Sequence, residues 1–171
     1  MDVHFESSYE RNDAVIKELT RYHYLSSLET VVTYIVMVIL FVANLILVCF
    51  NGLHHTQFIC FMLCFVFAVM QVINYRRDVK RTIARDRETY GEQPVRVYMQ
   101  VTEDRLIGKS STGTEGETLF ENIRYAVETK NLVILLTRAR QYHVMQKDAF
   151  TKGDWKEFLC FLEERGVKVR R

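Results

Sequence analysis

The chain has 171 residues, of which 49% are hydrophobic and 26% are charged, and its formal net charge at pH 7 is +2. The segment from Thr30 to Tyr75 contains no Asp, Glu, Lys or Arg. A soluble domain of this size cannot bury two helices that are apolar on all sides, so the composition excludes a single water-soluble core.

The first residues alternate weakly between polar and apolar side chains. Met1 to Glu6 either forms an extended arm that adds to a sheet edge or is disordered, and the sequence leaves both open. Ser7 with Glu10 has the spacing of a capping box, which predicts that a helix begins here. An apolar stripe of Val15, Leu19 and Tyr22 makes this helix amphipathic, so residues 1–28 are predicted to be an arm and a helix leading into the next segment.

Residues 29–75 are predicted to form a transmembrane helical hairpin. Its two helices cover about residues 30–50 and 57–75, and each is roughly 27–30 Å long, which matches the hydrocarbon core of a bilayer. Asn51 and Gly52 favour the turn between them. The first run begins too far into the chain, and is too long, for the apolar core of a signal peptide.

Asn44 lies in the middle of the first apolar run. An unpaired amide is costly at this depth, so we expect Asn44 to bond either to the second helix or to another subunit. Gln71 and Asn74 lie near the end of the second run and are expected to reach lipid headgroups. The two runs contain no ionisable carboxylate, Lys or Arg, which argues against a proton or ion path through them.

Residues 76–92 are predicted to continue as a basic helix at the membrane surface. The loop between the apolar runs has no Lys or Arg, so the positive-inside rule places both chain ends in the cytoplasm. Asp78 and Asp86 interrupt the basic run and no stacking aromatics alternate with it, which argues against a nucleic-acid partner. The candidate contacts to lipid headgroups are Arg76, Arg77, Lys80, Arg81, Arg85 and Arg87.

Residues 93–171 are predicted to form a small antiparallel β domain, with Gly91 and Pro94 marking the boundary. A period of two begins at Val95, and Thr102 to Arg105 is predicted to be a hairpin turn. A helix from about Lys152 to Arg165 follows, and its stripe of Trp155, Phe158, Leu159 and Leu162 is expected to cover the open face of the strands. The predicted strands are 95–101, 106–110, 118–123, 125–129, 132–137 and 142–146, with a flexible loop at 111–117.

We find no motif that indicates an enzyme, a metal or a cofactor. Gly108-Lys109-Ser110 resembles the end of a phosphate-binding loop, but Glu103 occupies the position that requires glycine. The spacing of Cys49, Cys60, Cys64 and Cys160 fits no zinc site, and small packing residues are the simpler interpretation. We therefore expect no catalytic, metal-binding or cofactor-binding residues.

Several motifs resemble the YcxB-like family of bacterial membrane proteins. They are Phe120 to Ile123, Glu128-Thr129, the apolar strand at 132–136, and Lys147 with Phe150; Gln146 stands where the family usually has proline. The resemblance implies two membrane helices followed by a pleckstrin-homology-like domain, which is an antiparallel sandwich or barrel capped by a C-terminal helix. Pleckstrin-homology domains often bind inositol phosphates through a basic first hairpin, but here the turn at 102–105 carries more acid than base.

These observations predict an α+β protein of the bacterial inner membrane, crossing it more than once, with both termini in the cytoplasm. The leading hypothesis is a non-enzymatic adaptor that presents a sheet edge or the 111–117 loop to a protein partner or to a second copy of the chain. One alternative is a module that senses anionic lipids, and another is an accessory subunit of a membrane transport complex.

Overall fold

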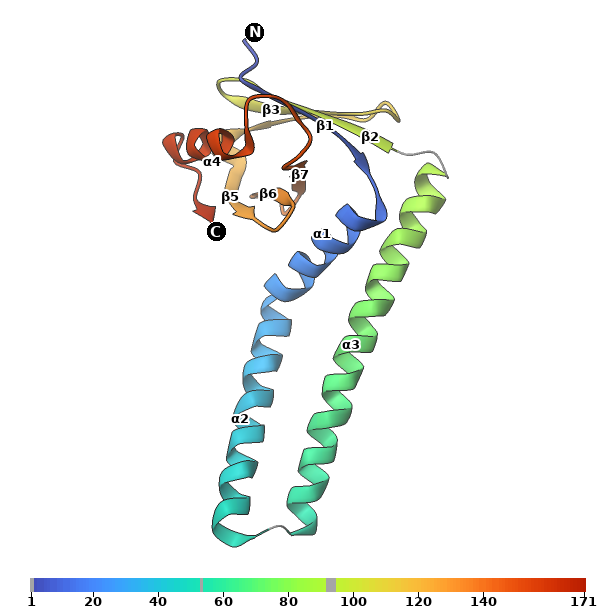
Figure 1. Cartoon of the computed structure of the whole chain (residues 1–171), viewed down its shortest axis with the longest axis vertical. Helices are drawn as coiled ribbons and strands as arrows, with labels where there is room; N and C mark the ends of the chain where they lie inside the picture. Colours follow the sequence, from blue (N-terminus) through green and yellow to red (C-terminus); the bar gives the residue numbers. More distant parts are fainter. Residues whose placement is uncertain (1, 53, 92–94) are drawn as a thin grey trace. The chain divides into compact units, whose positions relative to one another are not determined.

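The structure is a computed structural model that describes residues 2–52, 54–91 and 95–171. The chain divides into two compact units. The β unit comprises the chain up to Ile16 together with Arg87–Arg171, and the helical unit comprises Lys17–Asp86 (Figure 1). The predicted boundary at Pro94, with Glu92 and Gln93, and Leu53 in the predicted hairpin loop lie outside the described residues.

The β unit contains a five-stranded sheet whose strand order is β4-β3-β2-β1-β8. All its pairs are antiparallel. The strand from the N-terminus lies inside this sheet, because it pairs with β2 on one side and with β8 on the other. The strands are β1 (Phe5–Arg11), β2 (Val95–Val101), β3 (Arg105–Ser110), β4 (Glu115–Leu119) and β8 (Phe150–Lys152).

The prediction that a helix begins at Ser7 is wrong. Residues 5–11 form β1, in which Phe5, Ser7 and Tyr9 are buried and the residues between them are half-buried. This alternation places one face against the core, and seven residues pair with β2. The helix α1 (Asp13–Ser26) starts after Asn12, whose Oδ1 accepts hydrogen bonds from the N–H groups of Ala14 and Val15 at 3.0 Å.

A second sheet has the strand order β7-β6-β5-β9. Its strands are β5 (Ile123–Glu128), β6 (Leu132–Thr137), β7 (Tyr142–Gln146) and β9 (Val169–Arg170), and the β5–β9 pair is parallel. The predicted strand at 118–123 is wrong, because β4 ends at Leu119 and Phe120–Asn122 form a turn of 3₁₀-helix. The predicted loop at 111–117 is correspondingly too long, since β4 begins at Glu115.

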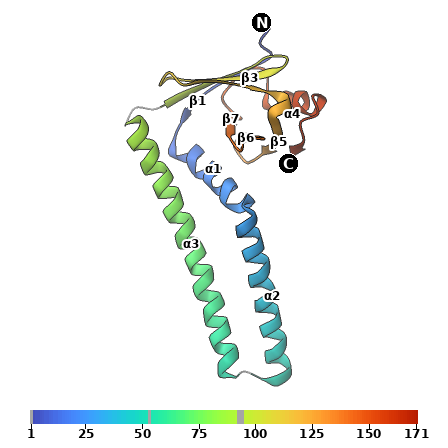
Figure 2. The same cartoon turned by 180° about the vertical axis from the view of Figure 1, so that it is seen from behind.

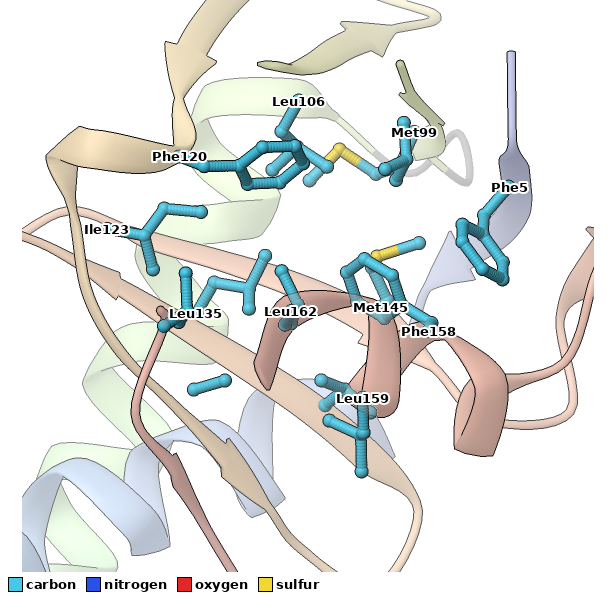
Figure 3. Close-up of a cluster of buried hydrophobic side chains, with 14 residues drawn as sticks. Phe5, Met99, Leu106, Phe120, Ile123, Leu135, Met145, Phe158, Leu159 and Leu162 are labelled. Atoms are coloured by element: carbon cyan, nitrogen blue, oxygen red, sulfur yellow. The ribbon is translucent and has the colours of Figure 1, made fainter. Parts of the chain in front are cut away.

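The core of the β unit lies between the two sheets and one helix, α4 (Trp155–Glu164). The predicted start at Lys152 is wrong, because this residue ends β8 and Asp154 occupies the N-cap position. The predicted apolar stripe is confirmed, with Phe158, Leu159 and Leu162 buried and Trp155 packed at the margin. Figure 3 shows these buried α4 side chains together with Met99 and Leu106 of the first sheet and Leu135 and Met145 of the second.

The helical unit contains two long antiparallel helices, α2 (Leu28–Asn51) and α3 (His55–Tyr90). They run side by side and are joined at one end by a short turn (Figures 1 and 2). Both contain stretches long and apolar enough to cross a membrane, and only 6% of each stretch is buried within the molecule. The fold is therefore α+β, with two long apolar helices and predominantly antiparallel sheets, as predicted from the hydropathy and strand patterns.

Candidate functional site

All six predicted lipid-contacting cations lie on α3, and all are exposed. They occupy the part of the helix that follows the apolar stretch, and they are Arg76, Arg77, Lys80, Arg81, Arg85 and Arg87. Arg87 forms an ion pair with Asp13, with 3.4 Å between Nη2 and Oδ2. Both side chains are about half exposed or more, so this pair contributes little to stability.

Arg77 and Arg81 line a polar pocket of about 350 Å³ in the helical unit. A spacing of four residues places them on one face of α3. Arg76, Lys80, Arg85 and Arg87 are not among the pocket's lining residues. The other lining residues are Tyr24, Thr30, Thr33, Gln71, Asn74 and Asp78.

Tyr24 connects one wall of this polar pocket to the other. Its hydroxyl donates to the side-chain Oε1 of Gln71 and lies 3.3 Å from the Gln71 carbonyl oxygen. The Tyr24 ring also packs on Tyr75, with 5.5 Å between centroids. Burial raises the pKa of the Tyr24 phenol, so the group stays neutral and remains a hydrogen-bond donor at pH 7.

Asn44 bonds within the hairpin. Its Nδ2 donates to the carbonyl oxygen of Gln57 at 3.1 Å, and both residues are buried. Of the two partners that the sequence leaves open, the structure therefore shows the one on the second helix. Near this bond, Phe41 and Phe61 meet edge to face with 5.4 Å between centroids.

An apolar pocket of about 430 Å³ lies beside Asn44, between α2 and α3. Its walls are aliphatic and aromatic side chains with two cysteines, so it offers a surface for hydrocarbon. Asn44 is the one amide in the lining, and its Nδ2 is engaged by Gln57. The remaining lining residues are Met37, Leu40, Ala43, Leu47, Cys60, Leu63, Cys64 and Phe67.

In the β unit, β4 is one of the two edge strands of the five-stranded sheet, and β8 is the other. Ser110 N–H donates to Thr114 O at 2.8 Å and Phe120 N–H donates to Asp104 O at 3.1 Å. Hydrogen-bonded positions alternate along an antiparallel pair, so the N–H groups of Glu115 and Glu117 point away from β3. The open edge therefore presents backbone donors flanked by two carboxylates.

Ion pairs hold the side chains of this edge and of the 102–105 turn. Lys109 pairs with Glu115 at 3.0 Å. Arg105 pairs with Glu117 at 3.0 Å and with Asp104 at 2.9 Å. The hydrogen bonds from Arg105 hold the pKa of Asp104 below its usual value. Because the arginine of this turn is already bound to carboxylates, the turn offers little positive charge to a phosphate.

His143 links the two sheets. Its Nε2 lies 3.0 Å from Thr118 Oγ1, so a residue of β7 in the second sheet meets a residue of β4 in the first. Burial lowers the pKa of His143 below 6.5, which favours the neutral ring at pH 7. In β1, burial raises the pKa of Tyr9 to about 12 and keeps its phenol neutral.

Within the part of the chain that the structure describes, no three His, Cys, Asp or Glu side chains gather in a way that could hold a metal ion. The polar pocket was only partly evident from the sequence, which indicated Arg77, Arg81, Gln71 and Asn74 but not Tyr24 or Asp78. A signal was present, since Thr30 and Thr33, and Gln71, Asn74 and Asp78, recur at spacings of three and four. Each set therefore lies on one helix face.

Residues 101–162 match the family model described as YcxB-like protein. The predicted resemblance is thus confirmed over a segment that runs from the last residue of β2 to the last turns of α4. We found no significant match among curated proteins or among solved structures.

The motif residues of this match have structural contacts in the β unit. Phe120 and Ile123 are buried in the core. Thr129 closes the β5–β6 turn through hydrogen bonds with Leu132. Lys147 Nζ lies 2.8 Å from Glu128 Oε1 and 4.2 Å from the centroid of the Trp155 ring. The motif thus supports the connection between the second sheet and α4.

Proposed function

We propose, from the YcxB-like match and the two apolar helices, that this chain is a non-enzymatic interaction module anchored in the bacterial inner membrane. The hairpin of α2 and α3 spans the bilayer, and the β unit lies on the cytoplasmic side. Two predominantly antiparallel sheets with a C-terminal helix support a pleckstrin-homology-like domain as the finer description of this unit. The observation that carries the proposal is the extent of apolar surface on the hairpin. Phe50, Leu63 and Phe65 are 83%, 63% and 64% exposed, which water disfavours and lipid accepts.

The pairing of β1 with β2 supports a hairpin rather than a single crossing. The two strands share seven pairs of residues in one sheet, so both must lie on the same side of the membrane. The segment between them must then cross an even number of times. Two candidate spans in this segment satisfy the requirement.

The charge distribution supports a cytoplasmic β unit, because the cations of α3 follow the second span and the turn between the spans has none. A labelling experiment on the full chain tests this orientation. Cys160 is exposed on α4, and with Cys49, Cys60 and Cys64 replaced by Ala it is the single thiol of the chain. A second variant has all four cysteines replaced by Ala and carries His54→Cys, which places its single thiol at the turn.

A membrane-impermeant maleimide should label His54→Cys in intact cells and should label Cys160 only after the inner membrane is permeabilised. Labelling of Cys160 in intact cells, or recovery of the chain in the soluble fraction without detergent, would contradict the anchor. The two single-cysteine chains serve as controls for each other, because each reports a different side of the membrane.

We further propose that the β4 edge receives a strand from a protein partner or from a second copy of the chain. The outward N–H groups of Glu115 and Glu117 offer backbone pairing, and their carboxylates favour a strand with Lys or Arg at alternate positions. Lys109 and Arg105 already pair with these carboxylates from the β3 side. A basic partner strand would flank them from the other side.

Glu117→Pro tests this edge, because proline removes an outward donor without removing a β3–β4 hydrogen bond. Glu117→Gln is the matched control, since it removes the same carboxylate and keeps the N–H. Full-length protein purified from its own membranes in mild detergent should retain the same partner with Glu117→Gln and lose it with Glu117→Pro. Equal recovery with both variants would show that the edge is not used.

A further inference from the structure

We propose that the hairpin binds one anionic phospholipid in a groove along α2 and α3. The headgroup occupies the polar pocket at Arg77 and Arg81, and an acyl chain follows the apolar pocket beside Asn44. The proposal rests on the membrane anchoring argued above. It adds a specific ligand, a specific face of the hairpin and a test that can fail while the anchor stands.

The two pockets lie along the same stripe of each helix. On α2 the lining residues follow one another at spacings of three and four through both pockets, as Thr30, Thr33, Met37, Leu40, Asn44 and Leu47. On α3, Cys60, Cys64, Phe67, Gln71, Asn74 and Asp78 follow the same rule in the opposite direction. Residues at such spacings form one face of a helix, so the two pockets follow one another along the same faces of α2 and α3.

The polarity of this groove changes along its length as the polarity of a phospholipid does. The polar part has two guanidinium groups and the apolar part has hydrocarbon and sulfur. Phe67 precedes Arg77 by ten residues, which is roughly 15 Å of helix and half of a bilayer's hydrocarbon core. A headgroup at Arg77 therefore places its acyl chain at the depth of Phe67 and Leu40.

Charge selects an anionic headgroup. Arg77 and Arg81 can each donate to phosphate oxygens, with the neutral amides of Gln71 and Asn74 beside them. Asp78 is the one carboxylate in the lining, and it reduces the formal charge of the pocket to +1 (two arginines minus one aspartate). Replacing this carboxylate should therefore strengthen binding, whereas replacing the arginines should weaken it.

Native mass spectrometry of the full-length protein in detergent tests the site. The probes are phosphatidylglycerol, phosphatidylcholine with the same acyl chains, and glycerol 3-phosphate, which has the phosphate without acyl chains. We expect phosphatidylglycerol to bind about tenfold more tightly than phosphatidylcholine, because charge-assisted contacts are the stronger ones. Glycerol 3-phosphate should bind at least about a hundredfold more weakly, since it leaves the apolar part empty.

Matched variants separate the groove from general attraction to a basic helix. Arg77→Gln with Arg81→Gln should lower the affinity for phosphatidylglycerol about tenfold or more, whereas Arg76→Gln with Lys80→Gln, which removes the same charge away from the pocket, should change it less than about threefold. Asp78→Asn should raise it severalfold. Ala43→Phe fills the apolar part and should lower the affinity, whereas Val42→Phe, at a position that does not line the groove, should not.

Three results would overturn the proposal. Equal losses in the two double variants would indicate attraction to the whole helix, and equal binding of the two lipids would remove the charge argument. A dimer that is free of lipid and that Ala43→Phe disrupts would identify the groove as an interface between copies. Each of these results leaves the membrane anchor intact, and the cysteine labelling described above decides that question separately.

Discussion

The ring of Phe5 occupies the space in which Gly153 would carry a side chain. A Cβ at Gly153 would lie 2.8 Å from Phe5 Cε1 and closer still to Cδ1, and the glycine has φ of +76°. The N-terminal strand therefore packs directly on the backbone that connects β8 to α4. This contact joins β1 to the connection between β8 and α4, and both the aromatic ring and the missing side chain are needed for it.

Gly153→Ala should lower the free energy of unfolding by about 3 kcal/mol. A left-handed conformation costs a non-glycine residue roughly 1–2 kcal/mol, and overpacking adds about 1–3 kcal/mol. Thermal unfolding of the full chain in detergent measures the change. Gly113→Ala is the control, because Gly113 has φ of +85° with open space around its Cβ position and should show the conformational cost alone. Equal losses for the two variants would show that Phe5 yields without cost.

Ser7→Ala should stabilise the β unit by about 1 kcal/mol. Ser7 is 2% exposed, and its Oγ has no hydrogen-bond partner among the described residues, so the hydroxyl is desolvated without compensation. The capping-box interpretation predicts the opposite sign, because an N-cap serine replaced by alanine costs about 1 kcal/mol. Chemical unfolding of the two chains distinguishes these outcomes. Ser8→Ala on the other face of β1 should change stability by less than about 0.5 kcal/mol.

Lys147→Met should lower the free energy of unfolding by about 2 kcal/mol. The Lys147 and Glu128 side chains are only 15% and 22% exposed, so losing the cation leaves a poorly solvated carboxylate and removes the contact with Trp155. A double-mutant cycle with Glu128→Gln should give a coupling energy of about 1 kcal/mol. The exposed Lys109–Glu115 pair provides the comparison, and its cycle should give no measurable coupling. Similar coupling in both cycles would contradict a special role for Lys147.

Stability should fall on acidification below about pH 6.5 because of His143. Burial lowers the pKa of this residue in the folded protein, so the unfolded chain binds more protons between the folded pKa and 6.5. The contribution of His143 to the free energy of unfolding is fully present above pH 6.5. It decreases as the pH falls from 6.5 to the pKa of the folded protein and is constant below that pKa. His143→Gln should reduce the slope of melting temperature against pH between 7.5 and 5.5. An unchanged slope would show that other groups cause it.

Much of the architecture was predictable because it follows from short-range patterns. The apolar runs predicted the two long helices. The alternation from Val95 predicted a strand at 95–101, and β2 has the same bounds. The stripe of α4 was also visible, since Phe158, Leu159 and Leu162 share one helix face. These features depend on residues close together in the sequence, where helix and strand periods are evident.

The predictions from sequence were wrong or incomplete where contacts between residues far apart in the sequence determine the structure. Phe5 to Arg11 pairs with β2 and β8, which lie on the far side of the hairpin in the sequence, and this pairing prevails over a capping-box pattern at Ser7 and Glu10. β8 and β9, of three and two residues, were missed because strands this short have no readable period. The polar pocket was only partly predicted for a similar reason, since Tyr24 reaches Gln71 from a different helix.

The position of β1 between β2 and β8 also governs the order in which this protein can be made. During synthesis β1 leaves the ribosome before β2 and β8 have been made. It therefore remains unpaired while the hairpin is synthesised. A fragment that begins after the hairpin would lack this interior strand. The edges of β2 and β8 that pair with β1 would then be unpaired and open to other chains. A water-soluble version of the β unit therefore requires the N-terminal strand to be joined to residue 95 by a short flexible linker in place of the helices.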